Sequence, residues 1–265
     1  MPTPFDHALF VLLAVFFPIR SRTFGYRRLR EAPLERVPTV RSGLYRQAIV
    51  LQWSFALAVV ALWAWQRRPW TDLGLVWRSH AWSFALAAGF ALLVAYLAVS
   101  VRSVLRDASG LLKVRRRLGP IERMLPRTDD ELRAFYRLSF TAGVCEEILY
   151  RGYLFWYLGH WLPAPAVLPA AALLFGIGHS YQGRRGMLTT GLAGLALGMV
   201  YLLSGSLYLP MVLHALSDVY SGTIGRAALQ AAEGEPYDST GIAARPPEPA
   251  AAGSSATEPP SGAAS

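Results

Sequence analysis

The chain alternates between long apolar runs and shorter segments that are rich in arginine. A helix that crosses a bilayer needs about 20 mostly apolar residues, within a range of about 17–25. The pattern therefore predicts an all-α, polytopic bundle of about seven transmembrane helices. The seven runs are Phe5–Ile19, Ala48–Trp65, Ala81–Val101, Phe135–Leu158, Ala164–Ser180, Met187–Leu203 and Leu207–Ile224.

The first of these runs is the least regular. Phe5–Ile19 is short and carries Asp6 and His7, so it predicts either a full span or a re-entrant or interfacial segment. Neither a basic segment before it nor a small-residue cleavage site after it is present, and we do not expect a cleaved signal peptide.

Arginine-rich and arginine-poor connections alternate along the chain. Residues 20–46 and 102–133 are rich in arginine, and Arg184 and Arg185 lie between the fifth and sixth runs. The connections at 159–163 and 204–206 contain no Lys or Arg. Because cytoplasmic loops carry an excess of these residues, the alternation predicts an N-terminus outside and a C-terminus in the cytoplasm.

The composition agrees with a multi-pass protein of the cell membrane. Charged residues make up 16% of the chain, against about 25% in soluble domains, and mean hydropathy is +0.30. The net charge of +9 comes from arginine blocks between apolar runs, which favours the lipid bilayer over nucleic acid as a partner. A single cysteine, Cys145, excludes an internal disulfide and a CxxC site.

Two boundaries divide the chain into three expected regions. Thr128 and Glu131 have the spacing of a capping box, which predicts the start of the helix that enters the fourth span. From Glu233 the chain is rich in Pro, Ala, Ser and Gly, which predicts a disordered tail. We expect N-terminal transmembrane helices with basic cytosolic loops over 1–127, a helix core over 128–232 and the tail over 233–265.

Ionisable side chains inside the apolar runs are concentrated in the C-terminal half. An Asp or Arg at the centre of a spanning helix costs about 2.5–3.5 kcal/mol on insertion scales, so such residues indicate a functional site. The residues concerned are Glu146, Glu147, Arg151, His179, His214 and Asp218.

The spacing of these residues suggests how they interact. Glu147 and Arg151 are four apart, which predicts an ion pair on one helix face. Glu146 points about 100° away from its neighbour and is a candidate general base. His214 and Asp218 also share a face; the Asp can set the tautomer of the His, the two can hold a metal or orient a water, or they can form a purely structural polar pair.

Three short motifs on successive helices resemble those of the CPBP family of intramembrane proteases, which includes the type II CAAX prenyl endopeptidases and the Abi or bacteriocin-processing proteins. The resemblance covers about Phe135–Ala227, and many family members carry Asn where this chain has Asp218. The motifs are Glu146-Glu147-x-x-x-Arg151, Phe175-x-x-x-His179 and His214-x-x-x-Asp218.

The resemblance implies an intramembrane endopeptidase that cuts a membrane-anchored protein or peptide, CAAX-type or other, with residues 128–232 as its catalytic helix core. The predicted topology places the cut near the cytoplasmic leaflet. The resemblance implies that Glu146 activates a water with help from His179. It also implies that His214 and Asp218 bind the scissile carbonyl or the tetrahedral intermediate.

The ion pair of Glu147 and Arg151 would then brace the site. The family has been described both as metal-dependent and as glutamate-dependent, and two histidines with a carboxylate are a possible zinc site. The sequence therefore allows zinc as a cofactor but does not require it. Two other functions also remain open: an ion- or proton-coupled transporter that uses the same groups as relays, and a catalytically idle scaffold or immunity protein of the same fold.

Overall fold

The computed structural model describes residues 1–77 and 83–231. These residues form helices and short connections without a strand, which confirms the all-α class. The predicted tail over 233–265, and residues 81 and 82 of the predicted span Ala81–Val101, lie outside the described residues. The elements are α1 Pro4–Val11, η1 Leu12–Phe16, α2 Phe17–Arg20, η2 Ser21–Tyr26, α3 Arg27–Glu31, η3 Leu34–Arg36, α4 Val37–Trp65, α5 Trp70–Leu73, α6 Ser83–Arg106, α7 Ala108–Leu118, η4 Gly119–Met124, α8 Asp129–Glu147, η5 Ile148–Leu154, α9 Phe155–Leu158, α10 Ala164–Gly178, η6 Ser180–Gln182, α11 Gly183–Ser204 and α12 Tyr208–Gln230.

Several helices extend beyond the apolar runs that predict them, whereas α10, Ala164–Gly178, ends two residues before the end of its predicted run Ala164–Ser180. Three helical stretches among the described residues are long and apolar enough to cross a membrane: Pro4–Glu31, Leu34–Trp65 and Ser180–Ser204. The apolar helix α10 has 15 residues, or about 22 Å at 1.5 Å per residue, and is shorter than an ordinary span. The total of seven spans stays a prediction, as does their orientation.

The first helical stretch, Pro4–Glu31, is longer than the predicted run Phe5–Ile19, and its charged residue Asp6 is neutralised. Asp6 is fully buried and accepts two hydrogen bonds from the Arg68 guanidinium, at 2.8 and 2.6 Å. That guanidinium lies 4.2 Å from the centre of the Trp156 ring. A buried carboxylate with a bidentate Arg partner needs no exit to water, so Asp6 is compatible with a position inside the helical stretch Pro4–Glu31.

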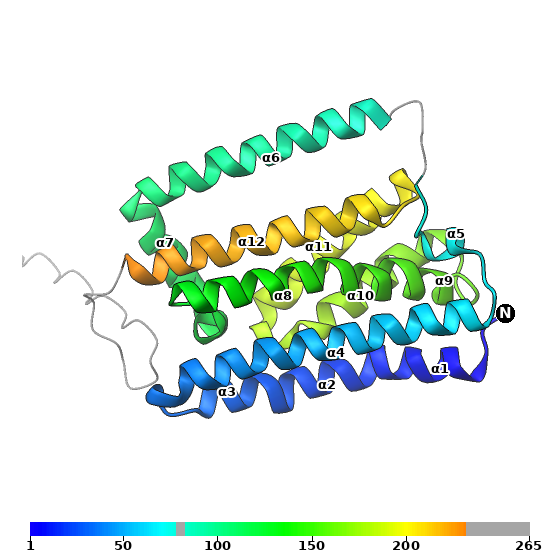
Figure 1. Ribbon diagram of the computed structural model, residues 1–265, viewed down its shortest axis with the longest axis horizontal. Helices are drawn as coiled ribbons and strands as arrows, with labels where there is room; N and C mark the ends of the chain where they lie inside the picture. Colours follow the sequence, from blue (N-terminus) through cyan, green and yellow to red (C-terminus); the bar gives the residue numbers. More distant parts are fainter. Residues whose placement is uncertain (78–82, 232–265) are drawn as a thin grey trace, which may run out of the picture. The chain divides into compact units, whose positions relative to one another are not determined.

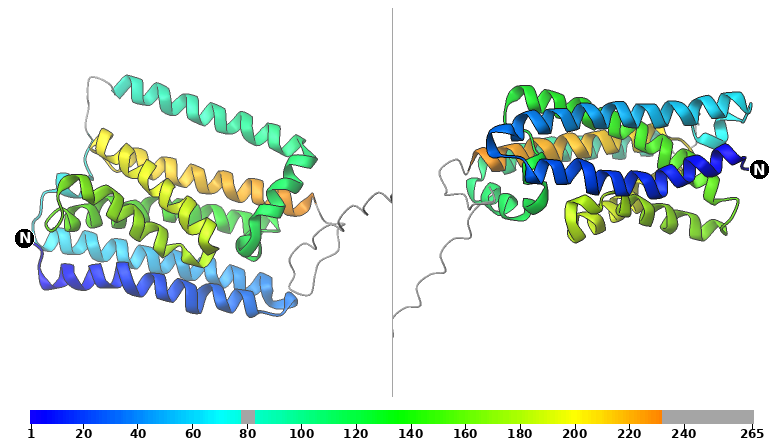
Figure 2. Two further views of the ribbon diagram at one scale, coloured as in Figure 1. Left: turned by 180° about the vertical axis from the view of Figure 1, so that it is seen from behind. Right: turned by 90° about the horizontal axis from the view of Figure 1, so that it is seen from below.

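Helix α8 lies between α4 and α12 and contacts both (Figures 1 and 2). Its continuation through η5 and α9 is buried almost throughout. Helices α10 and α11 pack closely against each other, and small residues make this approach possible. A Cβ on Gly176 would lie 2.8 Å from the carbonyl oxygen of Met187, so only glycine fits there.

Contacts between residues that are far apart in the sequence occur at both ends of the helix bundle. At one end, which carries the arginine-rich segments, the pairs are Tyr26 with Pro120, Arg41 with Glu131, and Asp129 with Arg226. At the other end the pairs are Thr3 with Gln66, His7 with Tyr157, and Gly74 with Leu207. Successive long helices thus run in alternating directions, as short connections between helices require.

The predicted capping box at the start of α8 is confirmed. The backbone N–H of Glu131 donates to the Thr128 hydroxyl, and the Glu131 carboxylate accepts from the N–H of Thr128. The same carboxylate pairs with Arg41 of α4 at 2.7 Å. Burial alone raises the pKa of the Glu131 carboxyl, but the backbone N–H of Arg127 and the Arg41 guanidinium outweigh burial and hold the pKa below its usual range.

Candidate active site

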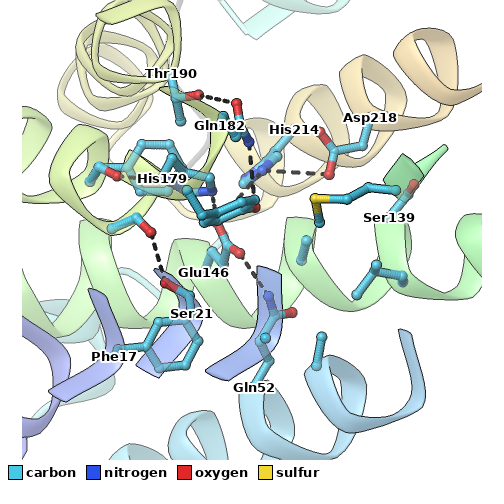
Figure 3. A pocket seen from close by; sticks show the side chains of 18 of the residues that line it. Phe17, Ser21, Gln52, Ser139, Glu146, His179, Gln182, Thr190, His214 and Asp218 are labelled. Atoms are coloured by element: carbon cyan, nitrogen blue, oxygen red, sulfur yellow. Dashed lines mark hydrogen bonds and ion pairs between the residues drawn. The ribbon is translucent and has the colours of Figure 1, made fainter. Parts of the chain in front are cut away.

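The structure brings the ionisable residues of three helices together beside one cavity of about 540 Å³ (Figure 3). Helix α8 and η5 supply one acidic pair and an arginine, the end of α10 supplies a histidine, and α12 supplies a histidine and an aspartate. Four of the six predicted residues line the cavity: Glu146, His179, His214 and Asp218. Glu147 and Arg151 do not line it; they are buried, form an ion pair with each other, and contact the cavity residue His214 through Glu147.

Glu146 faces the two histidines. Its side chain is 8% exposed, and its Oε1 accepts a hydrogen bond from Gln52 Nε2 at 2.7 Å. Oε2 is buried and receives no hydrogen bond from the part of the chain that the structure describes. It lies 3.9 Å from His179 Nε2 and 4.0 Å from His214 Nε2. These distances are too long for direct hydrogen bonds and suit a bridging water or a substrate oxygen.

Both histidines present the same nitrogen to Glu146. His179 Nδ1 is 2.8 Å from the carbonyl oxygen of Phe175, and His214 Nδ1 is 2.7 Å from Glu147 Oε1. Because a carbonyl and a carboxylate only accept hydrogen bonds, each Nδ1 carries a proton and donates. Each Nε2 is therefore left to interact with the contents of the cavity.

The predicted ion pair of Glu147 and Arg151 is confirmed. Arg151 Nη1 donates to Glu147 Oε1 at 2.7 Å, and both side chains are buried. Arg151 also donates from Nη2 to the Gly194 carbonyl of α11, and its guanidinium lies 4.5 Å from the centre of the Phe175 ring. The arginine thus joins the acidic helix to both α10 and α11.

Asp218 does not set the tautomer of His214, which was one of the alternatives left open for this pair. Its nearest carboxylate oxygen is 4.0 Å from His214 Nε2, and its side chain is 38% exposed. The carboxylate that hydrogen-bonds His214 is Glu147 of the neighbouring helix. Helices α8 and α12 approach closely at Gly143, which brings Glu147 within reach of Nδ1. Asp218 therefore faces the cavity beside Nε2.

Gln52 is the site residue that the sequence reasoning missed. It lies in α4, in the apolar run Ala48–Trp65. Its amide is polar but not ionisable, and only ionisable side chains inside the apolar runs were taken to indicate a site. A buried amide in such a run also needs a hydrogen-bond partner. An isolated Gln within a predicted span therefore predicts a polar contact, but it does not identify the partner.

The rest of the cavity is mostly apolar. Side chains from the first helix, from α4 and from α8 line it together with η4, and the ionisable groups occupy one part of its wall (Figure 3). Apolar lining residues include Leu13, Phe17, Leu51, Met124, Leu138 and Leu149. Such a cavity suits a ligand with a large apolar portion and a few polar atoms near Glu146.

Comparison with known proteins adds to this geometry. Residues 129–220, about a third of the chain, match the family model described as type II CAAX prenyl endopeptidase Rce1-like. Residues 129–220 are called the Rce1-like domain below, after the family model that they match. All six predicted site residues lie within it, and the resemblance to the CPBP family is confirmed. No curated protein and no solved structure matches the chain.

The side chains of the Rce1-like domain do not fit a zinc site. Two ligands of a tetrahedral zinc ion lie roughly 3.4 Å apart, given metal–ligand distances of about 2.0–2.2 Å. Glu146 Oε2 is 3.9 and 4.0 Å from the two histidine nitrogens. Within residues 1–77 and 83–231, no group of three or more His, Cys, Asp or Glu side chains has an arrangement that could hold a metal ion.

Proposed function

We propose that this membrane protein is an intramembrane endopeptidase in which Glu146 activates the attacking water. One observation carries the proposal: Glu146 Oε2 is buried, has no hydrogen-bond partner among the described residues and faces two histidine nitrogens across about 4 Å. An oriented carboxylate beside two imidazoles, at the wall of a mostly apolar cavity, is suited to general base catalysis.

The reaction follows from the positions of these groups. Glu146 takes a proton from water while the oxygen bonds to the carbonyl carbon of the scissile peptide, and His179 Nε2 helps to hold that water. The carbonyl oxygen becomes an oxyanion, which His214, protonated on both nitrogens, stabilises by donating from Nε2. The C–N bond then breaks, and the proton on Glu146 passes to the leaving amine.

The proposed substrate is a membrane-anchored protein or peptide, with a prenylated CAAX peptide as the first candidate. The apolar cavity and the Rce1-like domain support this choice. The arginine-rich end of the bundle supports cleavage near the cytoplasmic leaflet in a multi-pass protein of the cell membrane. The bilayer is the second expected partner, since exposed apolar side chains cover the helices.

Replacement of Glu146 by Gln tests the proposal. The amide keeps the shape of the side chain but cannot accept the proton of water, so the cleavage rate should fall by about a hundredfold or more. The assay uses purified full-length protein in liposomes with two labelled peptides, one farnesylated with a CAAX end and one transmembrane. Glu35→Gln, at an exposed position of η3, is the matched control and should cleave at the wild-type rate.

The other outcomes separate the remaining functions. Cleavage by Glu146→Gln at the wild-type rate contradicts the proposed base. Absence of cleavage by the wild-type protein, together with proton-driven flux across the same liposomes, favours the transporter. Absence of both favours the idle scaffold.

A further inference from the structure

Gln52 is a buried amide that reaches the proposed active site from outside the Rce1-like domain. It lies in the middle of α4, is 6% exposed and is 77 residues before the start of the matched segment at residue 129. Its Nε2 donates to Glu146 Oε1 at 2.7 Å. Figure 3 shows the amide between α4 and the Glu146 side chain, at the wall of the cavity.

The two ends of this amide are chemically distinct. Glu146, as a carboxylate, only accepts hydrogen bonds, so the NH₂ end of Gln52 must face it. The carbonyl end then points away from Glu146. That oxygen is buried and receives no hydrogen bond from the described part of the chain. Leaving a buried acceptor unsatisfied is unfavourable, so a donor from a bound ligand would stabilise it.

A peptide substrate supplies such donors. Each residue except proline carries a backbone N–H that must be satisfied when the peptide leaves water, so a peptide bound in this mostly apolar cavity needs acceptors from the side chains that line it. Gln52 lines the cavity, its Oε1 is a buried acceptor without a partner among the described residues, and its other end binds the proposed general base.

We propose that Gln52 is both a positioning residue for Glu146 and a binding residue for the substrate backbone. Through Nε2 it holds Glu146 Oε1, which leaves Oε2 directed at the two histidines. Through Oε1 it accepts a backbone N–H of the bound peptide near the scissile bond. This inference rests on the proposed function and adds to it a residue from α4.

Gln52→Met removes both hydrogen bonds while keeping the length and bulk of the side chain. Loss of the contact to Glu146 should lower kcat by between about ten- and a hundredfold, because the base is no longer held in place. Loss of the contact to substrate should raise KM by about two- to tenfold. Ser54→Ala is the control on α4, because the Ser54 side chain is exposed and bonds only to the Val50 carbonyl of its own helix.

A series of ester-substituted substrates separates substrate binding from a purely structural role. Each peptide replaces one backbone amide near the scissile bond by an ester, which removes one N–H. With the wild-type protein, one ester in the series should raise KM about two- to tenfold. With Gln52→Met, the same ester should raise KM no further, because the acceptor is already absent.

Each outcome bears on the inference. Wild-type kinetics in Gln52→Met, or an ester effect of equal size in both proteins, would overturn the inference and leave the proposed function standing. No cleavage by the wild-type protein would overturn both. If Gln52→Met does not fold in detergent, Gln52→Asn is measured in its place, since the shorter amide no longer reaches Glu146 and the same two changes are expected.

Discussion

At the scale of single residues, one carboxylate oxygen organises much of the site. Glu147 Oε1 accepts from Arg151 at 2.7 Å and from His214 Nδ1 at 2.7 Å, and the side chain is fully buried. The oxygen therefore fixes the ring of His214 and neutralises the arginine that binds α11. Glu146, the adjacent residue, is left to face the cavity.

Glu147→Gln should therefore destabilise the protein. The substitution leaves Arg151 without a charged partner in a low-dielectric environment, and breaking a buried pair in this way costs about 3–5 kcal/mol. Thermal unfolding in detergent measures the loss. Glu31→Gln is the control, because the Glu31 pair with Arg27 is exposed and should contribute almost nothing. Equal melting temperatures for the two variants would contradict the role given to Glu147.

At the scale of helices, the contact between α8 and α12 sets the distance between the acidic pair and His214. A Cβ on Gly143 would lie 2.7 Å from both the Ala215 Cβ and the Met211 carbonyl oxygen, and 2.8 Å from the Ala215 nitrogen. Two of these neighbours are backbone atoms of α12, which cannot move independently of that helix. Glycine at this position is therefore what lets His214 reach Glu147.

Gly143→Ala should push the two helices apart. We expect a loss of about 1–3 kcal/mol in stability from overpacking, together with a fall in kcat of about tenfold or more as His214 moves from its partner. Gly43→Ala is the matched control in α4, where a new Cβ meets nothing within 4 Å and should stabilise the helix by about 0.5–1 kcal/mol. Thermal unfolding and the liposome assay measure both effects. A Gly143→Ala variant with unchanged kcat would show that this helix spacing does not matter for the reaction.

At the scale of the whole molecule, the distribution of arginine agrees with the helix directions. The basic segments of α3 and α7 lie near the end where Tyr26 binds Pro120 and Arg226 binds Asp129. The connection around Trp161 follows α9 at the opposite end, where His7 meets Tyr157. The positive-inside rule then assigns the basic end to the cytoplasm.

Cysteine labelling checks this orientation. A cysteine at position 161 should react with a membrane-impermeant reagent in intact cells, and one at position 116 should react only after permeabilisation. Trp161 and Arg116 are exposed, and the native Cys145 is buried, so the new thiols report on their own positions. The reverse pattern of labelling would contradict the predicted topology.

The sequence by itself determined the features that depend on near neighbours. The lengths of the apolar runs identify an all-α membrane protein, the spacing of Thr128 and Glu131 locates the start of α8, and that of Glu147 and Arg151 predicts their ion pair. In each case the partners lie within one helical turn, so the 3.6-residue period alone brings them together. The ordered motifs also identify the residues of the candidate site.

Only the tertiary structure decided which helices share that site. Gln52 and Glu146 are 94 residues apart, Glu147 and His214 are 67 apart, and Asp6 and Arg68 are 62 apart. Helical periodicity carries no information over such separations. These contacts depend on how whole helices dock, which glycine contacts and side-chain volumes control. For this reason the partner of His214 is Glu147 rather than its sequence neighbour Asp218, and Asp6 lies within a continuous helix.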